Sequence, residues 1–228
     1  MKKQLTKLAL TTALVLAITL ILNACEGGGD VKLPETITDE SGKVQRFEYD
    51  KQNRIVKIGD KTITYADNLI TVGTQKYVIN GNTITLDADS SSFTINGDGY
   101  IVAPPSISCY GGCPEYFVYK DGNLIADNSG RGIGYEYDDK KSPFSNSTTP
   151  KWLMQILLVD ISASKNNVVM IDEEDGSSTY KYEYDSDGFP VIAKMTVEYT
   201  DYAEGTGTTI THRTTRYAYR GSTAGYAK

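Results

Sequence analysis

Residues 43–102 read KVQRFEYDKQNRIVKIGDKTITYADNLITVGTQKYVINGNTITLDADSSSFTINGDGYIV, and this stretch decides the fold. Short runs rich in Val, Ile, Thr, Tyr and Phe are separated by clusters of Asn, Asp and Gly, which is the signature of β-hairpins. The expected strands cover residues 44–49, 55–58, 62–65, 69–72, 77–79, 83–86, 92–95 and 100–102. The stretch therefore predicts an antiparallel meander of short strands.

The same pattern resumes after Pro104-Pro105, which interrupts the meander. Further strands are expected at residues 115–120, 123–126, 133–137, 168–171, 178–184, 191–199 and 208–219. The chain contains 17 Tyr and many Thr, and both residue types are favoured on half-exposed pleated surfaces. The sequence therefore predicts a mostly β protein.

One segment has helical spacing instead. Its apolar residues at helical intervals are Trp152, Leu153, Ile156, Leu157 and Ile161. Thr149 can cap such a helix, and Pro150 suits its first position. Because Leu158 and Val159 make the segment apolar on most sides, we expect one short buried helix. A strand over residues 155–161 is the alternative.

The first 24 residues have the character of an export signal. Lysines at positions 2, 3 and 7 precede an apolar run over residues 8–22, which is shorter than the ~20 residues of a membrane-spanning helix but matches a signal peptide. The run ends in Leu22-Asn23-Ala24-Cys25, which resembles the lipobox of bacterial lipoproteins. The resemblance implies that Cys25 is acylated and anchors the protein to the membrane, since several acyl chains give stable anchoring. A short transmembrane anchor with an unmodified Cys25 is the alternative.

These features divide the chain into three parts. Residues 1–24 are the expected signal peptide, and residues 25–40 are the lipidated cysteine and a flexible tether that begins Glu26-Gly-Gly-Gly-Asp30. Residues 41–228 form the expected single β-rich domain, with a subdivision near residue 104 as the alternative. We expect the protein to be lipid-anchored in the cell envelope, at the outer membrane, and the sequence leaves open which side it faces.

The charge balance excludes one class of partner. The chain has 23 Lys and Arg against 29 Asp and Glu, a formal net charge of −6. Loss of the three signal-peptide lysines leaves 20 basic residues against 29 acidic ones, a charge of −9. Because nucleic-acid binding depends on cationic contacts to phosphate, no nucleic-acid partner is expected.

The two cysteines other than Cys25 close a small loop, Cys109-Tyr-Gly-Gly-Cys113. In an oxidising compartment a disulfide between Cys109 and Cys113 is expected. Free or redox-active thiols are the alternative. A zinc site would need two more good ligands, and His212 is the only histidine. No metal and no other cofactor is predicted.

No catalytic residues are predicted either. His212 lies in an alternating, Thr-rich strand, where a polar outward face explains it without a catalytic role. The acidic groups Asp87/Asp89, Glu173/Glu174/Asp175 and Asp185/Asp187 all fall in expected turns, where Asp serves the backbone. The tyrosines have two interpretations: exposed rings can dock a sugar or a protein, and rings at alternate strand positions can pack across strands.

One tetrapeptide pattern occurs three times, as Phe47-Glu-Tyr-Asp50, Tyr135-Glu-Tyr-Asp138 and Tyr182-Glu-Tyr-Asp185. Aromatic residues two positions apart share one face of a strand, and the Asp begins the following turn. Asn53 and Gly188 fall at the same offset after the first and third copies. A positive φ is cheap at such residues, so we expect it there.

The first and third copies, extended to Lys57 and Val191, resemble the tyrosine–aspartate (YD) hairpin units of Rhs-type proteins. Together with Tyr-Asp-Asp-Lys-Lys-Ser-Pro-Phe at 137–144 and Ser-Lys-Asn-Asn at 164–167, they resemble a family of Bacteroidetes lipoproteins of unknown function over residues 41–199. The resemblance implies a strongly curved antiparallel sheet or an open barrel. It brings no known activity.

Three functional hypotheses follow. The leading one is a non-enzymatic binding module of the cell envelope, with a glycan, peptide or protein as ligand. The second is a hydrolase of envelope or dietary polymers, which needs two facing carboxylates in a cleft. The third is a thiol–disulfide protein that uses Cys109 and Cys113.

Overall fold

The computed structural model describes residues 31–103, 116–128, 132–158, 160–201 and 207–220. The features below belong to the compact unit Lys32–Lys228. The expected signal peptide, Cys25, Cys109 and Cys113 lie outside the described residues, so the lipid attachment and the disulfide stay predictions.

The described residues form one 16-stranded antiparallel sheet, which confirms the mostly β fold. The strands are β1 (Pro34–Thr38), β2 (Val44–Tyr49), β3 (Ile55–Ile58), β4 (Lys61–Ala66), β5 (Leu69–Val72), β6 (Gln75–Asn80), β7 (Thr83–Leu86), β8 (Ser92–Ile95), β9 (Ile101–Ala103), β10 (Phe117–Lys120), β11 (Asn123–Asp127), β12 (Ile133–Tyr137), β13 (Val168–Glu173), β14 (Gly176–Tyr184), β15 (Pro190–Asp201) and β16 (Gly207–Tyr219).

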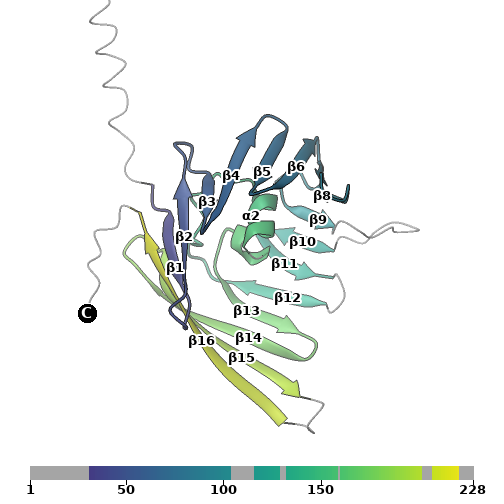
Figure 1. The fold of residues 1–228 in the computed structure, drawn as a ribbon. Coiled ribbons are helices and arrows are strands. Elements are labelled where there is room, and N and C mark those ends of the chain that lie inside the picture. Colours follow the sequence, from purple (N-terminus) through teal and green to yellow (C-terminus); the bar gives the residue numbers. More distant parts are fainter. Residues whose placement is uncertain (1–30, 104–115, 129–131, 159, 202–206, 221–228) are drawn as a thin grey trace, which may run out of the picture. The chain divides into compact units, whose positions relative to one another are not determined.

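The strand order makes the sheet close almost on itself. Strands β10 to β16 follow in chain order, β1 lies between β16 and β2, and the sheet ends at β9. The edge strands β9 and β10 then meet: the Tyr119 hydroxyl donates to the Ile101 carbonyl at 3.2 Å, and the Tyr119 ring stacks on Tyr100 at 4.3 Å. The sheet is nearly closed and barrel-like (Figure 1), as the open-barrel expectation implied.

Strand β1 lies in the region that the sequence assigned to the tether. It pairs with both β16 and β2, and the Tyr49 hydroxyl donates to the Pro34 carbonyl at 2.8 Å. Just before it, Lys32 Nζ lies 2.7 Å from a carboxylate oxygen of Asp185 and of Asp187. Partial burial alone would raise the pKa of Asp185, but the hydrogen bonds from Lys32 and from its own turn lower it. The ordered domain therefore includes residues that precede position 41.

One hairpin turn is built four times with the same hydrogen bonds. Its first residue accepts backbone N–H groups two and four residues later on Oδ1, and the four first residues are Asp39, Asp50, Asn96 and Asp185. The fourth residue of each turn has a positive φ, and these residues are Gly42, Asn53, Gly99 and Gly188. The positive φ expected at Asn53 and Gly188 is confirmed, at 64° and 79°.

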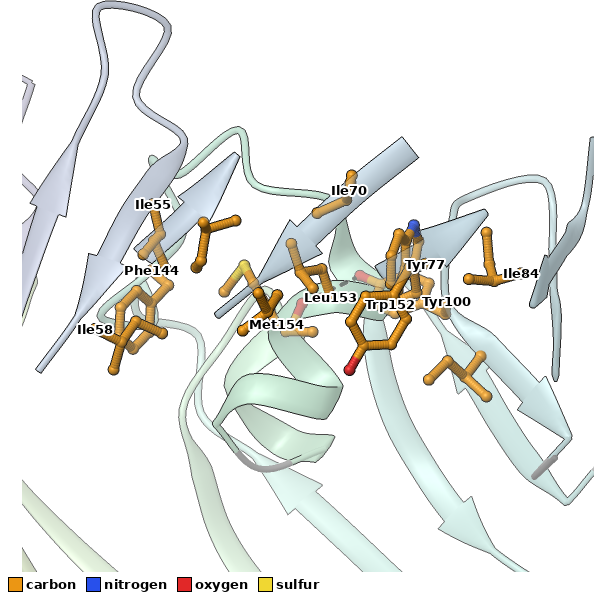
Figure 2. Close-up of a cluster of buried hydrophobic side chains, with 14 of the residues drawn as sticks. Ile55, Ile58, Ile70, Tyr77, Ile84, Tyr100, Phe144, Trp152, Leu153 and Met154 are labelled. Carbon is orange, nitrogen blue, oxygen red and sulfur yellow. Dashed lines mark hydrogen bonds between the residues drawn. The ribbon is translucent and has the colours of Figure 1, made fainter. Parts of the chain in front are cut away.

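The helix α2 (Lys151–Leu157) lies on the inner side of the curved sheet (Figure 1), and the 3-10 turn η1 (Asp160–Ala163) follows it in the chain. Trp152, Leu153 and Met154 are buried against the inner residues of strands β2 to β9 (Figure 2). The Trp152 ring lies 5.6 Å from Tyr77 and 5.7 Å from Phe93, measured between centroids. The short buried helix is confirmed. No helix in the described part of the chain is long and apolar enough to cross a membrane.

Two details of the helix differ from the sequence prediction. The hydroxyl of Thr149 does not cap the helix, because it accepts the backbone N–H of Ile55 in β3 at 2.8 Å. The helix also ends at Leu157, short of Ile161. Within it, the buried Gln155 accepts the N–H of Ile101 at 2.9 Å. The side chains of Thr149 and Gln155 therefore accept hydrogen bonds from the backbone of strands β3 and β9, and not from the helix.

Candidate ligand-binding groove

An open groove of about 850 Å³ lies where three hairpins and the end of α2 come together. The β1–β2, β3–β4 and β5–β6 turns all contribute to it. Its lining residues are Ile37, Asp39, Lys43, Val44, Gln45, Ile58, Gly59, Asp60, Lys61, Val72, Gly73, Thr74, Gln75, Tyr77, Ile156 and Leu157. Its volume falls in the range of roughly 300–1,000 Å³ that is typical of ligand sites.

The apolar part of the groove is mostly aliphatic. Ile37, Ile58 and Val72 come from strands, and Ile156 and Leu157 from the last turn of α2. Val44 is 45% exposed and Ile156 is 38% exposed, although both are large hydrophobic residues. Exposed apolar side chains that gather in one concave place mark a binding surface, because a ligand removes them from water.

Tyr77 adds a neutral polar group to the groove. Its side chain packs against Trp152 and is only 6% exposed, and its hydroxyl has no hydrogen-bond partner among the described residues. Burial raises the pKa of Tyr77, so the hydroxyl stays protonated at neutral pH and can donate or accept. Gln45 and Gln75 also line the groove, and Gln75 Nε2 donates to the Lys76 carbonyl at 3.1 Å.

The charged groups of the groove balance one another. Asp39 and Asp60 stand against Lys43 and Lys61, so the lining carries no formal charge. Asp39 is also engaged within its own turn, where Ser41 Oγ donates to it at 2.6 Å and lowers its pKa. A hydrolase would need a pair of free, facing carboxylates. The lining has two carboxylates, those of Asp39 and Asp60, and that of Asp39 is already hydrogen-bonded in its turn.

Neither His212 nor any of the acidic groups singled out in the sequence lines the groove. His212 is exposed on β16, with its Nδ1 3.1 Å from Thr196 Oγ1. Asp89 accepts the backbone N–H of Ser91, and Asp87 lies 3.8 Å from Lys76 Nζ. Over the residues that the structure describes, no group of three His, Cys, Asp or Glu side chains could hold a metal ion.

Many tyrosines are used for packing. Several hydroxyls donate to backbone carbonyls, namely Tyr49 to Pro34, Tyr65 to Ile55, Tyr100 to Gly122, Tyr182 to Val168 and Tyr219 to Pro190. The rings of Tyr180, Tyr182 and Tyr184 follow one another along β14 with centroids 6.2 and 5.8 Å apart. For these residues the cross-strand packing interpretation fits better than sugar docking.

Sequence reasoning missed the groove. Its lining comes from strands β1 to β6 and from α2, which are up to about 120 positions apart in the chain, so no local motif marks it. The one signal was Ile156, an apolar residue on a helix that is apolar on most sides and was expected to be buried. Its exposure shows that one side of α2 lies open.

Comparisons with known proteins bear on the fold. No family model matches the sequence, and no curated protein matches it. A crystal structure described as a porin-like protein from Bacteroides uniformis matches with a TM-score of 0.50 and 15% identity, over 82% of this chain and 98% of that chain. A porin-like protein from Bacteroides vulgatus has a TM-score of 0.47 and 13% identity, over 82% and 99%. The first likeness shows that the two proteins share the nearly closed antiparallel fold.

Proposed function

We propose that this protein is an exported lipoprotein of the cell envelope, anchored through a lipid on Cys25, whose β domain binds a ligand without catalysis. The groove carries the binding role, because Val44, Ile156 and their aliphatic neighbours lie open in a space of ligand size. The lipobox-like residues 22–25 support the anchor. The porin-like description of the Bacteroides uniformis structure agrees with an envelope location.

The ligand that fits the groove is an extended peptide segment with uncharged aliphatic side chains, from another protein of the envelope. The aliphatic lining suits its side chains. Because the two acidic and two basic residues of the lining cancel in charge, the groove does not favour a charged segment. The Tyr77 hydroxyl and the amides of Gln45 and Gln75 offer partners to peptide N–H and C=O groups, which need them once water is excluded. A glycan fits less well, because its many hydroxyls would meet aliphatic carbon.

We expect Val44→Lys to weaken peptide binding at least tenfold, because the ammonium group would have to leave water beside aliphatic side chains. The probe is a fluorescein-labelled peptide of alternating leucine and serine, and fluorescence anisotropy gives its Kd. Val78→Lys is the matched control, since Val78 also lies on a strand, is 42% exposed and is absent from the groove lining. Equal weakening of peptide binding by both variants would contradict the assignment. So would a protein that binds glycans from a panel but binds no aliphatic peptide.

The lipid anchor has a separate test. Cys25→Ala should abolish incorporation of an alkyne-tagged palmitate and move the protein from the membrane fraction to the soluble fraction, since several acyl chains are what hold such a protein on a bilayer. Cys109→Ala is the control and should keep both label and location. Membrane retention of the unlabelled Cys25→Ala protein would instead support the short transmembrane anchor.

A further inference from the structure

The chain enters the β domain at one fixed place, Lys32. The Nζ of Lys32 lies 2.7 Å from Asp185 Oδ2 and 2.7 Å from Asp187 Oδ2, both in the β14–β15 turn. Its carbonyl accepts the side-chain amide of Asn146 at 3.0 Å. The next residue, Leu33, is fully buried. Any segment that precedes Lys32 is therefore attached at this point of the domain.

The strand pattern places Lys32 at the opposite end of the sheet from the groove. Successive turns of an antiparallel meander alternate between the two ends of its strands. The groove is lined from the β1–β2, β3–β4 and β5–β6 turns. Pro34 at the start of β1 pairs instead with Tyr219 at the end of β16, and its carbonyl accepts the hydroxyl of Tyr49, next to the β2–β3 turn. We call the end with Lys32, the β2–β3 turn and the β14–β15 turn the tether end (Figure 1).

The length of the chain before Lys32 limits how the domain can approach a membrane. Six residues, 26–31, separate Cys25 from Lys32, and these seven steps span at most about 25 Å when fully extended. Strand β2 runs between the two ends of the domain and has six residues, which gives a rise of about 20 Å. To reach a bilayer that holds Cys25, the groove would need nearly the whole of this length laid along the side of the domain. The tether end reaches the same bilayer without that extension.

The charge of the tether end also suits a membrane surface. The loop 138–149 belongs to this end, since Asn146 contacts Lys32 and Ser147 contacts Asn53. Six basic and six acidic side chains lie in the segments of this end, which are 32–34, 50–54, 66–68, 138–149, 185–189 and 220. The tether end is therefore balanced in charge, and the excess of acidic residues lies elsewhere in the chain. Anionic lipids repel acidic surfaces, so the balanced end is the one that they oppose least.

We propose that the tether end faces the bilayer and that the groove opens at the opposite end, toward the aqueous phase. The inference rests on the lipid anchor proposed for Cys25. It narrows the proposed ligand to a peptide segment that extends into the aqueous compartment. A segment that lies within the headgroup layer would meet the tether end and not the groove.

Energy transfer to a labelled membrane tests this orientation. The full-length lipidated protein, with Cys109 and Cys113 replaced by serine, is reconstituted into vesicles of phosphatidylethanolamine and phosphatidylglycerol that contain a rhodamine-labelled lipid. A donor dye is attached through Lys51→Cys at the tether end or through Thr74→Cys at the groove, where both native side chains are exposed. We expect roughly twofold greater transfer from position 51, because the strands separate the two positions by about 20 Å. Equal transfer, or greater transfer from position 74, would overturn the proposal.

Flotation of the same vesicles separates this result from the test of the anchor. Protein that floats with the vesicles but shows equal transfer from both positions refutes the orientation and leaves the anchor standing. Protein that does not float refutes the anchor, and the orientation with it. A variant in which residues 26–31 are duplicated is the matched control, since a longer tether should reduce the difference between the two positions. An unchanged difference would contradict the role of tether length.

Discussion

Trp152→Ala is expected to lower the free energy of unfolding by about 3–5 kcal/mol, which is a large share of the stability of a domain of this size. The Trp152 side chain is buried and lies against the rings of Tyr77 on β6 and Phe93 on β8. Figure 2 shows it beside Leu153 and Met154, which point from the helix toward the same strands. Its removal would leave a cavity between the helix and the inner side of the sheet.

The measurement is urea unfolding followed by far-UV circular dichroism, because Trp152 is the only tryptophan and its loss removes the fluorescence signal. Ile156→Ala is the matched control on the same helix. Since Ile156 is partly exposed in the groove, its truncation should cost less than ~1 kcal/mol. Similar losses for the two variants would show that α2 is not held to the sheet through Trp152.

Asp138→Ala is expected to lower the free energy of unfolding by about 2–4 kcal/mol. The Asp138 carboxylate accepts hydrogen bonds from the backbone N–H of Asn167 at 3.1 Å, from the side-chain amide of Asn167, and from the hydroxyl of Tyr184. It also accepts the N–H of Lys140 in its own turn at 3.0 Å. Burial, together with the hydrogen bond and the charge of Asp138, raises the pKa of Tyr184, so that hydroxyl stays a donor at neutral pH. Without the carboxylate these partly buried donors lose their acceptor.

Asp50→Ala is the matched control for Asp138→Ala. It tests whether the loss of stability comes from the Asp that ends each copy of the tetrapeptide pattern, or from the distant partners of Asp138. Asp50 ends the first copy of the pattern, but among the described residues its carboxylate accepts hydrogen bonds only from nearby groups, which are the N–H groups of Gln52 and Arg54 and Nε of Arg54. Because all of these donors belong to the turn that Asp50 begins, and the N–H of Gln52 is exposed, we expect a smaller loss of about 1 kcal/mol in the same urea experiment. Equal losses at Asp50 and Asp138 would contradict the long-range role of Asp138.

The turns were the most predictable part of this molecule. Asp50 and Asp185 begin hairpins as their sequence pattern indicates, and Asn53 and Gly188 adopt the left-handed backbone expected at their offset. All the bonds of such a turn join residues at most four positions apart. Their identity is therefore enough to specify the turn, and the antiparallel pairing of its two strands follows from it.

Side chains with distant partners were predicted less well. Thr149 has the residue type and position of a helix cap, yet its hydroxyl binds the backbone of Ile55 in β3. Strand β1 is short and polar, and it becomes a strand because β16 and β2 flank it. Ile55 lies 94 positions from Thr149, and the residues of β16 that pair with β1 lie about 180 positions away, so the neighbouring residues give no signal for these two contacts. The pairing of β1 with β2, in contrast, goes through the local turn that begins at Asp39.

The sequence by itself determined where the strands and turns after residue 43 fall, that one short helix is buried, and that the protein is mostly β, because alternation and turn chemistry act over a few residues. Only the tertiary structure decided that the sheet nearly closes, that Val44 and Ile156 lie open in one groove, and that Asp138 binds Asn167 and Tyr184. The physical reason is that each of these features joins residues from segments that are far apart in the chain. Patterns that act over a few residues cannot specify such contacts.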